Sequence, residues 1–528
     1  ETLELSGAKL GQDHAQLPLY RAPSLDWALS GQTGVRFNRD DAFRRISRSF
    51  HAVKDSEYAP PVSLQKTLRK YQRDGYRWLR TLDGYGMGGI LADDMGLGKT
   101  VQVLSYLLAM KQNGQTLPSL IVCPASLVLN WAEECQKFTP ELACVVVDGD
   151  AAHRAELAES WPAADLVVTS YDLLRRDEAL YEGQEFYACI LDEAQAIKNH
   201  TTQKYKAVCK VRSRVRFALT GTPVENRLGE LWSIFSFLMP GYLPPYKSFC
   251  SRFEKPIVQE EDQTAVRRLT QLTGPFILRR MKADVLKELP PKTENVYRIE
   301  LEEEQRKLYL AAVVDAREKL QAAKPEDKMA VFAVLMRLRE ICCDPRLIAD
   351  NWEGGSAKLD ACAELVSSAV EGGHRILLFS QFTSMLELLA KRLDAEGISH
   401  FTLQGSTPKP VRAELVRRFN GGEVSVFLIS LRAGGTGLNL TAADIVIHYD
   451  PWWNVAAQNQ ATDRAYRIGQ QNPVQVYKLI AQDTIEEKIV ELQQAKQSLA
   501  DTVTGTADGA ILSMRPDELL QLLEGSEP

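Results

Sequence analysis

The segment Asp93–Thr100, which reads DDMGLGKT, places glycines and a Lys-Thr pair between a short apolar run and a helical pattern. Glycines let backbone N–H groups approach phosphate oxygens, and the N-terminus of the following helix adds partial positive charge. In such a loop Lys99 would contact the β- and γ-phosphates of a nucleotide, and the Thr100 hydroxyl would bind Mg²⁺. Asp93 replaces the first glycine of the usual phosphate-loop pattern, so the competing interpretation is an ordinary glycine-rich turn. The residues predicted to bind ATP in this loop are Asp94, Met95, Gly96, Leu97, Gly98, Lys99 and Thr100.

Two adjacent carboxylates, Asp192 and Glu193, directly follow the apolar run Tyr187–Leu191. In an α/β sheet the ligand crevice lies at the carboxyl ends of the strands. Asp192 could there hold the water shell of Mg²⁺, and Glu193 could orient and deprotonate an attacking water. A lone Asp-Glu pair after a strand is usually a solvated acidic turn. The phosphate loop upstream in the same half of the chain favours the catalytic interpretation.

These two segments and Leu219–Asn226 resemble motifs I, II and III of superfamily-two ATPases of the Swi/Snf type, in which an aspartate-rich phosphate loop is usual. Upstream, the pattern LRxYQxxG at Leu68–Gly75 resembles the adenine-reading Q motif. The resemblance implies that Gln72 reads the edge of adenine and that Arg69 also lies in the ATP site. It extends from about Leu68 to about Leu499, with motif order and spacing both in agreement.

The segment Gln460–Gln470 resembles motif VI of the same family. Arg464 and Arg467 are three residues apart, which predicts that both project from one helical face. Such arginine fingers neutralise charge that develops on the γ-phosphate and are typically worth about 10³–10⁵ in rate. The alternative is a pair of surface arginines on an exposed helix. The predicted catalytic residues are Lys99, Asp192, Glu193, Arg464 and Arg467, with Thr100 and Asp192 as the ligands of Mg²⁺.

The segment Leu431–Leu440 resembles motif V, which the family places between the nucleic-acid backbone and the nucleotide, so Gly437 is also assigned to the ATP site. Further loops offer backbone N–H and hydroxyl donors, which suit phosphates and carry no base information. Trp452 either contacts DNA or packs in the core, and the sequence leaves both open. The predicted DNA-binding residues are Pro124, Ser126, Thr169, Ser170, Gly405, Ser406, Thr407, Gly434, Gly435 and Trp452.

A short basic cluster, Arg279, Arg280 and Lys282, is expected to contribute to DNA binding at the edge of a groove. The alternatives are a solvated helix and a brace between lobes.

Short apolar runs that alternate with helical patterns predict two α/β lobes with parallel sheets. The predicted strands are Gly89–Ala92, Ser119–Pro124, Leu166–Tyr171, Tyr187–Leu191, Arg216–Thr220, Arg375–Ser380, His400–Gln404, Val424–Ser430, Asp444–Tyr449 and Val474–Ile480. With the resemblance, the expected fold class is α/β, with two RecA-like lobes of the P-loop NTPase type and helical protrusions. The expected parts are an N-terminal segment of unknown role (1–60), a first lobe (61–290) with a protrusion at about 229–290, a linker with a second protrusion (291–345), a second lobe (346–485), and a brace helix with a tail (486–528).

The 528 residues carry a net charge of −6, so any polyanion site must be a local basic stripe on an acidic body. The sequence contains no run of about 18 apolar residues, so we expect no membrane span. The nine cysteines show no zinc-ligand spacing and fit a reducing compartment. We expect a bacterial protein in the cytoplasm and nucleoid, or in the nucleus if eukaryotic. Because the chain begins with Glu1, we expect a piece of a longer protein.

The resemblance implies a motor that hydrolyses ATP with Mg²⁺, is stimulated by double-stranded DNA, and translocates along it to displace or remodel bound proteins. We expect a monomer that contacts the DNA backbone. Two alternatives stay open at this point: a helicase that separates strands, and an ATP-gated DNA clamp that does not hydrolyse ATP.

Overall fold

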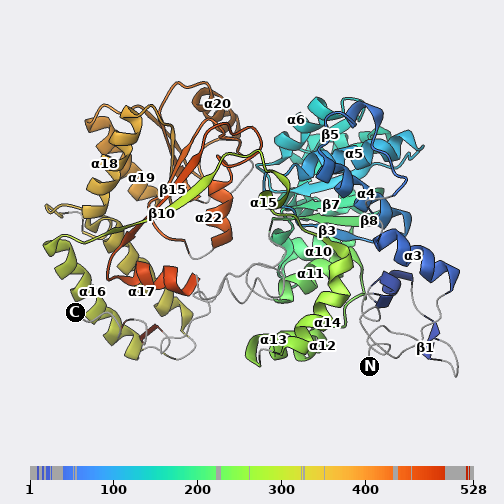
Figure 1. Ribbon diagram of the computed structural model, residues 1–528, viewed down its shortest axis with the longest axis horizontal. Helices are drawn as coiled ribbons and strands as arrows, with labels where there is room; N and C mark the ends of the chain where they lie inside the picture. The colour runs from blue at the N-terminus through green and yellow to red at the C-terminus, as the bar shows by residue number, and fades with distance from the viewer. Residues whose placement is uncertain are drawn as a thin grey trace. The chain divides into compact units, whose positions relative to one another are not determined.

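The computed structural model describes residues 9–10, 15–16, 19–23, 25–26, 40–51, 53, 56–221, 228–260, 262–322, 324, 327–349, 351–431, 438–452, 455–493, 519–520 and 523. The chain divides into two compact units, Glu1–Lys287 and Glu288–Pro528, here called unit 1 and unit 2. Each unit contains its own large sheet (Figure 1), and unit 1 also contains a two-stranded antiparallel sheet of β1 (Lys9–Leu10) and β2 (Ala15–Gln16).

The sheet of unit 1 is parallel throughout its described strands, in the order β5-β6-β4-β7-β8-β3-β9. Its strands are β3 (Gly89–Leu91), β4 (Ser119–Cys123), β5 (Cys144–Val146), β6 (Leu166–Ser170), β7 (Glu185–Asp192), β8 (Arg212–Leu219) and β9 (Ile277–Leu278). Every strand predicted in this half is present, and β5 and β9 are additional. The near-continuous burial of β3, β4, β6 and β7 is expected of parallel strands covered on both faces.

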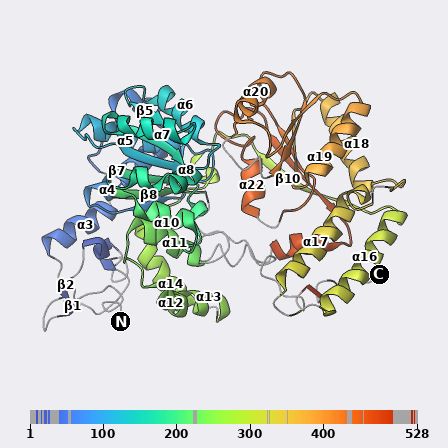
Figure 2. The same cartoon turned by 180° about the vertical axis from the view of Figure 1, so that it is seen from behind.

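Helices lie on both faces of this sheet, and α12, α13 and α14 gather at one side of unit 1 in both views (Figures 1 and 2). The helix α5, which follows the phosphate loop, is buried along most of its length, as expected of a helix that is apolar on all sides. The helices are α3 (Asp41–His51), α4 (Lys70–Gly84), α5 (Lys99–Gln112), α6 (Val128–Phe138), α7 (Ala151–Ser160), α8 (Tyr171–Arg176), α9 (Glu178–Tyr181), α10 (Gln203–Lys210), α11 (Leu228–Leu238), α12 (Tyr246–Phe249), α13 (Lys255–Gln259), α14 (Gln263–Thr273) and α15 (Lys282–Val285).

The sheet of unit 2 is also parallel throughout its described strands, in the order β10-β15-β14-β11-β13-β12. Its strands are β10 (Lys292–Ile299), β11 (Ile376–Ser380), β12 (His400–Leu403), β13 (Val426–Ser430), β14 (Ile445–His448) and β15 (Val474–Ala481). Two parallel sheets flanked by helices confirm the predicted α/β class with two RecA-like lobes.

The strand β10 was not predicted, because a linker was expected from residue 291. Its side chains are exposed except for Ile299, so the strand lacks the apolar run that identified the others. It pairs along its full length with β15, from Lys292 opposite Val474 to Ile299 opposite Ala481. The chain therefore enters the sheet of unit 2 at Lys292, directly after Pro290 and Pro291.

The helices of unit 2 are α16 (Glu303–Ala322), α17 (Lys328–Cys343), α18 (Ala357–Glu371), α19 (Thr383–Ala395), α20 (Lys409–Asn420), α22 (Val455–Thr462) and a helix at residues 485–493. The helices α16 and α17 pack against each other and share a core with Leu519 and Leu523, and the assignment of this region as a second helical protrusion stays a prediction. Among the described residues, no helix is long and apolar enough to cross a membrane.

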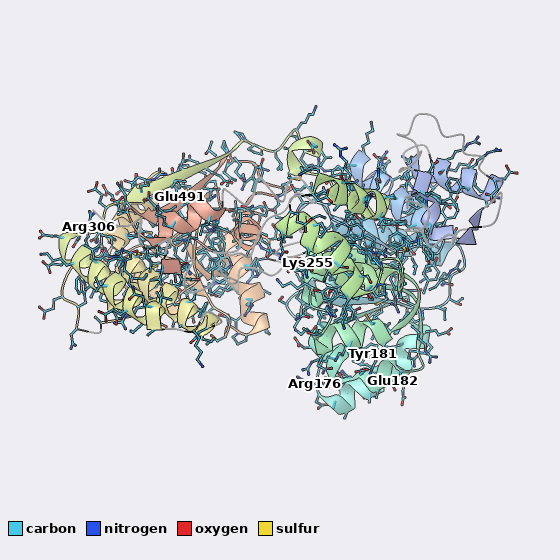
Figure 3. The ribbon with its side chains drawn as sticks, turned by 90° about the horizontal axis from the view of Figure 1, so that it is seen from below. Arg176, Tyr181, Glu182, Lys255, Arg306 and Glu491 are labelled. Carbon is cyan, nitrogen blue, oxygen red and sulfur yellow. The ribbon has the colours of Figure 1, made fainter. Side chains whose placement is uncertain are left out.

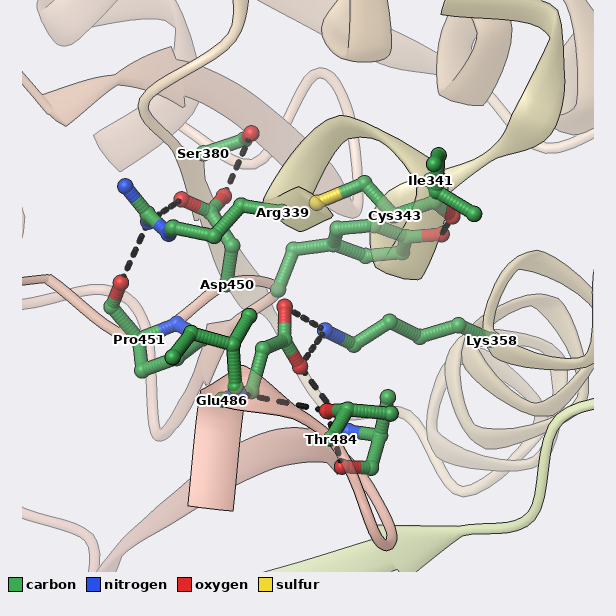
Figure 4. Close-up of polar contacts among 12 residues, drawn as sticks. Arg339, Ile341, Cys343, Lys358, Ser380, Asp450, Pro451, Thr484 and Glu486 are labelled. Atoms are coloured by element: carbon green, nitrogen blue, oxygen red, sulfur yellow. Dashed lines mark hydrogen bonds and ion pairs between the residues drawn. The ribbon is translucent and has the colours of Figure 1, made fainter. Parts of the chain in front are cut away.

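Two buried ion pairs hold the elements of unit 2 together (Figure 4). Arg339 of α17 contacts Asp450 at 3.2 Å, and Lys358 of α18 contacts Glu486 at 2.6 Å, all four side chains being 0% exposed. The second oxygen of Asp450 accepts a hydrogen bond of 2.6 Å from Ser380. Because breaking a buried pair leaves an uncompensated charge, the cost is about 3–5 kcal/mol. These contacts fix α17, α18 and the helix at 485–493 around the end of β14.

Candidate active site

The carboxyl ends of β3, β7 and β8 meet at one edge of the unit 1 sheet. Leu91 at the end of β3 lies opposite Leu219 at the end of β8, and Leu219 lies opposite Asp192 at the end of β7. The phosphate loop, Asp192 and Thr220 therefore start from adjacent strand ends, where ligands bind in such sheets. This is the arrangement predicted for motifs I, II and III. Residues 222–227 of motif III lie outside the described residues.

Glycine is required at position 98 both by the backbone conformation and by the lack of room for a side chain. Gly98 has a φ of 75°, and a Cβ there would lie 2.5 Å from Nε2 of Gln72. The Gln72 amide donates to the carbonyl of Leu97 at 3.1 Å, and the Tyr71 hydroxyl donates to the same carbonyl at 2.9 Å. The oxygen of Gln72 accepts from the backbone N–H of Arg69 at 2.9 Å. Gln72 thus holds the phosphate loop to α4, and its contact with adenine stays a prediction.

Lys99 begins α5, and its ammonium group donates to the carbonyl of Asp93 at 2.6 Å. The same ammonium group also donates to the carbonyl of Asp94 at 3.4 Å. The hydroxyl of Thr100 and the carboxylate of Asp192 are hard oxygen donors, which fit Mg²⁺, an ion that keeps several of its waters.

Asp93 is fully buried and pairs with Arg280, whose side chain is 12% exposed. Lys282 is 6% exposed, and its backbone N–H donates to the Asp94 carboxylate at 2.9 Å. The prediction that Arg280 and Lys282 line the edge of a DNA groove is therefore wrong, because both side chains are buried beside the phosphate loop. The role of Arg279, which is half-buried, stays a prediction.

The carboxylate of Asp192 accepts one hydrogen bond from the indole of Trp131 at 2.8 Å and one from the backbone N–H of Glu193 at 2.9 Å. Removal from water, and then the neighbouring Glu193 carboxylate, raises the pKa of Asp192 to about 7, against the opposing effects of Trp131 and Lys99. A cation bound at this carboxylate would offset the cost of its charge. No pattern in the sequence indicated a role for Trp131.

Glu193 has a φ of 49°, a left-handed conformation that is uncommon for a residue other than glycine. A conformation of this kind costs about 1–3 kcal/mol and persists only where surrounding contacts enforce it. Such residues are common at functional sites. Here the side chain of Gln195 donates to the Glu193 carboxylate at 2.8 Å and accepts from the Thr220 hydroxyl at 3.0 Å. Gln195 lies two residues after Glu193, and no role was predicted for it.

The two predicted DNA loops of unit 1 follow β4 and β6, which are neighbours in the sheet. Thr169 is fully buried and accepts a hydrogen bond from Tyr181 at 3.0 Å. The hydroxyl of Ser170 caps α8 by accepting from the N–H of Leu173 at 3.2 Å. Both hydroxyls thus have partners within unit 1. Pro124 and Ser126 are half-buried, and their contact with DNA stays a prediction.

Arg464 and Arg467 do not lie on a helical face, contrary to the prediction, because α22 ends at Thr462. The carbonyl of Arg464 accepts from the N–H of Leu440 at 3.0 Å, and the carbonyl of Ala465 accepts from the amide of Gln470 at 3.1 Å. These two carbonyls therefore accept hydrogen bonds from outside the helix instead of from the next helical turn. Arg464 is 3% exposed, whereas Arg467 is half-buried.

The loop after β12 is held from within unit 2. Arg412 donates to the carbonyls of Gln404 at 3.1 Å and Gly405 at 2.7 Å, and the hydroxyl of Thr407 accepts from the N–H of Gln404 at 3.1 Å. Gly405 and Ser406 are exposed, as backbone contact with DNA would require.

Trp452 packs partly buried against the core of unit 2, which favours the packing interpretation of this residue. Gly434, Gly435 and Gly437 of motif V lie outside the described residues.

The chain matches two families: the SNF2-related domain over residues 71–347 and the helicase conserved C-terminal domain over residues 357–469. It is 40% identical to the uncharacterized ATP-dependent helicase MG018 of Mycoplasma genitalium, over 87% of this chain and 44% of that protein. It is 34% identical to the TATA-binding protein-associated factor MOT1 of Saccharomyces cerevisiae, over 91% of this chain and 30% of that protein.

Among solved structures, the Sulfolobus solfataricus SWI2/SNF2 ATPase core in complex with dsDNA is 36% identical, covering 83% of this chain and 93% of that chain, with a TM-score of 0.43. The chain spans about half or less of the length of the curated relatives it matches. The SNF2-related match alone covers more than half of the chain. By this match, the chain belongs to the SNF2-related family of helicase-like ATPases.

Proposed function

We propose that the protein is a motor that hydrolyses ATP to ADP and phosphate when bound to double-stranded DNA, and that it translocates along the DNA to displace or remodel bound proteins. The observation that carries this proposal is the position of the phosphate loop and Asp192-Glu193 at the carboxyl ends of β3 and β7, the two strands that flank β8 in one sheet. A nucleotide phosphate and an attacking water need those two groups on the same edge of the sheet.

Each residue of the candidate site in unit 1 has a distinct part in the proposed hydrolysis. The phosphate loop binds the triphosphate through its backbone and Lys99. Mg²⁺, held by Thr100 and Asp192, would neutralise charge on the phosphate oxygens. Glu193, oriented by Gln195, accepts a proton from the attacking water.

In this proposal the site is completed by unit 2. Arg464 and Arg467 stabilise the charge that develops on the γ-phosphate, as arginine fingers do. Hydrolysis then requires the two units to close around the nucleotide, and alternate closure and opening moves them along the DNA. ATP binding by unit 1 alone would not suffice for turnover.

The DNA partner is proposed from the resemblance and from the loops at the two sheet edges. The loops at Pro124–Ser126 and Gly405–Thr407 follow strand carboxyl ends and offer backbone donors that suit phosphates. One relative is named for association with the TATA-binding protein. By analogy, the substrate of the motor is a protein bound to DNA, and the motor itself is proposed to act as a monomer.

The central test is the rate of ATP hydrolysis with no nucleic acid, double-stranded DNA, single-stranded DNA and RNA, measured side by side. The proposal expects the highest rate with double-stranded DNA, and displacement of a third strand from a DNA triplex in an ATP-dependent manner. Equal rates under all four conditions would contradict the proposal.

Two other functions make different predictions in the same assays. A strand-separating helicase would release a labelled strand from a duplex, with streptavidin displacement as the control for simple translocation. An ATP-gated clamp would bind DNA in the presence of ATP and release no phosphate. The carboxylate pair and the phosphate loop favour hydrolysis over the clamp.

A further inference from the structure

The end of β9 and the residues after it run beside the phosphate loop as if they were its next strand. The N–H of Ala92 donates to the carbonyl of Leu278 at 2.7 Å, and the N–H of Asp94 donates to the carbonyl of Arg280 at 3.0 Å. The N–H of Lys282 returns a hydrogen bond to the Asp94 carboxylate at 2.9 Å. The first half of the phosphate loop is therefore bound to a segment nearly 190 residues later in the chain.

The largely buried guanidinium group of Arg280 adds side-chain hydrogen bonds to these backbone contacts. Its Nε donates to one oxygen of Asp93 at 2.7 Å, and one terminal nitrogen donates to the other Asp93 oxygen and to Oε1 of Gln102 at 2.7 Å. Its other terminal nitrogen donates to the carbonyl of Tyr71. A Cβ on Gly75 would lie 1.8 Å from Gln102 and 2.8 Å from Arg280, so glycine at this position leaves room for the guanidinium group. We call these contacts of Arg280 and Asp93 the Arg280 clamp.

The Arg280 clamp acts on the residue that positions Lys99. The carbonyl of Asp93 accepts the hydrogen bond from the Lys99 ammonium, while the carboxylate of the same residue is held by Arg280. Bidentate arginine–carboxylate pairs fix orientation as well as charge. The conformation of Asp93, and with it the place of Lys99, thus depends on Arg280.

The same arginine stands close to the point where the chain leaves unit 1. The helix α15 begins at Lys282, and unit 1 ends at Lys287. Residues 281–287 therefore lead to unit 2, and the N–H of Lys282 is hydrogen-bonded to the Asp94 carboxylate of the phosphate loop. A change in the geometry of the loop on nucleotide binding would reach these residues through this hydrogen bond and the one between Asp94 and Arg280.

We propose that Arg280 is a positioning residue for the nucleotide site, which fixes the phosphate loop through Asp93 and couples it to the connection at residues 281–287. The inference rests on the proposed function, because the loop is taken to bind ATP. It adds a residue from outside the nucleotide motifs and a route by which nucleotide binding in unit 1 reaches the chain that enters unit 2.

The test uses the full chain with three variants. Arg280→Lys keeps the charge and loses the guanidinium group, Asp93→Asn keeps the shape and loses the charge, and the double variant Arg280→Gln/Asp93→Asn removes both charges at similar volume. The double variant matters because a single loss of Arg280 leaves a buried carboxylate unpaired, which alone can unfold a protein. The control is Arg176→Ala, since Arg176 projects from α8 at the surface of unit 1 (Figure 3).

Three measurements are made on folded protein, with thermal midpoints recorded for each variant: the affinity for a fluorescent ADP, the kcat and KM for ATP with DNA, and hydrogen exchange of residues 281–287 with and without ADP. We expect nucleotide affinity to fall tenfold or more in all three variants, KM to rise in parallel, and kcat at saturation to change less than threefold. We expect ADP to slow exchange of residues 281–287 severalfold in the parent and in Arg176→Ala, but not in Arg280→Lys.

The inference is overturned if Arg280→Lys and the double variant bind ADP within twofold of the parent, or if ADP slows exchange equally in the parent and in Arg280→Lys. A parent protein that binds ADP tightly and shows no ATP hydrolysis with any nucleic acid would instead overturn the proposed function. The two failures are therefore distinguished by the behaviour of the parent.

Discussion

The amide nitrogen of Gln195 lies 2.8 Å from a carboxylate oxygen of Glu193 and donates a hydrogen bond to it. The oxygen of the same amide accepts from Thr220, which follows β8. One side chain thus sets the orientation of the proposed general base relative to the strand that leads into motif III. Because Glu193 is also in a left-handed backbone conformation, its carboxylate depends on such a contact to stay in place.

The first prediction concerns this contact. Gln195→Ala should lower kcat by roughly 10- to 100-fold, since a small misplacement of a catalytic group is that costly, while ATP affinity stays within about twofold. Steady-state phosphate release and nucleotide titration would measure the two effects. The matched control is Gln203→Ala, at an exposed position of α10. Equal rates for Gln195→Ala and the control would remove Gln195 from the site.

The second prediction separates binding from chemistry in unit 1. Lys99→Ala should weaken triphosphate binding tenfold or more, whereas Glu193→Gln should keep ATP bound and reduce turnover by roughly 10²–10⁴-fold. Fluorescent ATP titration and single-turnover hydrolysis would show the difference, with Lys206→Ala on the surface of α10 as the control. Hydrolysis by Glu193→Gln at the parental rate would contradict the assignment of the base.

The third prediction concerns the arginines of unit 2. Arg464→Ala or Arg467→Ala should leave ATP binding within about threefold of the parent and lower DNA-stimulated hydrolysis by roughly 10³-fold or more. Arg417→Ala serves as the control, because its side chain is 74% exposed on α20. If either variant lost ATP affinity as Lys99→Ala does and kept its kcat, it would not be an arginine finger.

The fourth prediction is a pH dependence of stability that arises from His448. This side chain is 1% exposed, stacks on Phe379 and shares a hydrogen bond of 2.9 Å with Thr462. Burial lowers its pKa to about 3. Between the unfolded value of about 6.5 and this folded value, the unfolded chain binds the proton and the folded chain does not, so stability falls as the pH falls. His448 alone accounts for a loss of up to about 2 kcal/mol between pH 6.5 and 5.

Chemical unfolding of the parent and His448→Gln at pH 8 and pH 5 would test this effect. The variant should lose less stability between the two pH values than the parent, and the exposed His153→Gln should behave as the parent does. An equal loss in the parent and His448→Gln would show that other groups dominate.

The fifth prediction concerns the proposed DNA contacts. Binding to the phosphate backbone releases counterions, so the dissociation constant should rise roughly tenfold or more between 50 and 200 mM salt. Because backbone donors carry no base information, two unrelated duplexes should bind equally within about threefold. Titrations on both duplexes at several salt concentrations would measure this. A strong preference for one sequence, or an affinity indifferent to salt, would argue against backbone tracking.

The sequence predicted the buried strands well because a parallel strand between helices must be apolar on both faces. It missed β10, which is an edge strand with exposed side chains, β5, which is a three-residue edge strand that is only partly buried, and β9, which has only two residues. The helical face proposed for Arg464 and Arg467 was wrong because the residues after α22 make other contacts. The carbonyl of Arg464 is bonded to Leu440, which is distant in the sequence, and that of Ala465 to the nearby side chain of Gln470.

At the candidate site, the residue types of Lys99, Asp192 and Glu193 were informative because few side chains can serve phosphate and water in this way. The contacts that orient these residues were not predictable, because Trp131 and Arg280 reach the site from other elements and because the sequence does not show which way the side chain of Gln195 turns. A basic cluster such as Arg279–Lys282 looks the same in sequence whether its charges face solvent or a buried carboxylate. Only the fold shows that Arg280 faces Asp93.

The extent of homology and the extent of a self-supporting fold differ in unit 2. The helicase C-terminal match covers residues 357–469, whereas β15 and β10 lie outside it on either side. A fragment cut to the match would leave β14 with an open edge, which invites pairing between molecules. It would also bury Asp450 without Arg339 and Lys358 without Glu486. Because Leu519 and Leu523 share the core of α16 and α17, a gene fusion or exchange that kept the second lobe intact would therefore have to carry residues 288–523 together.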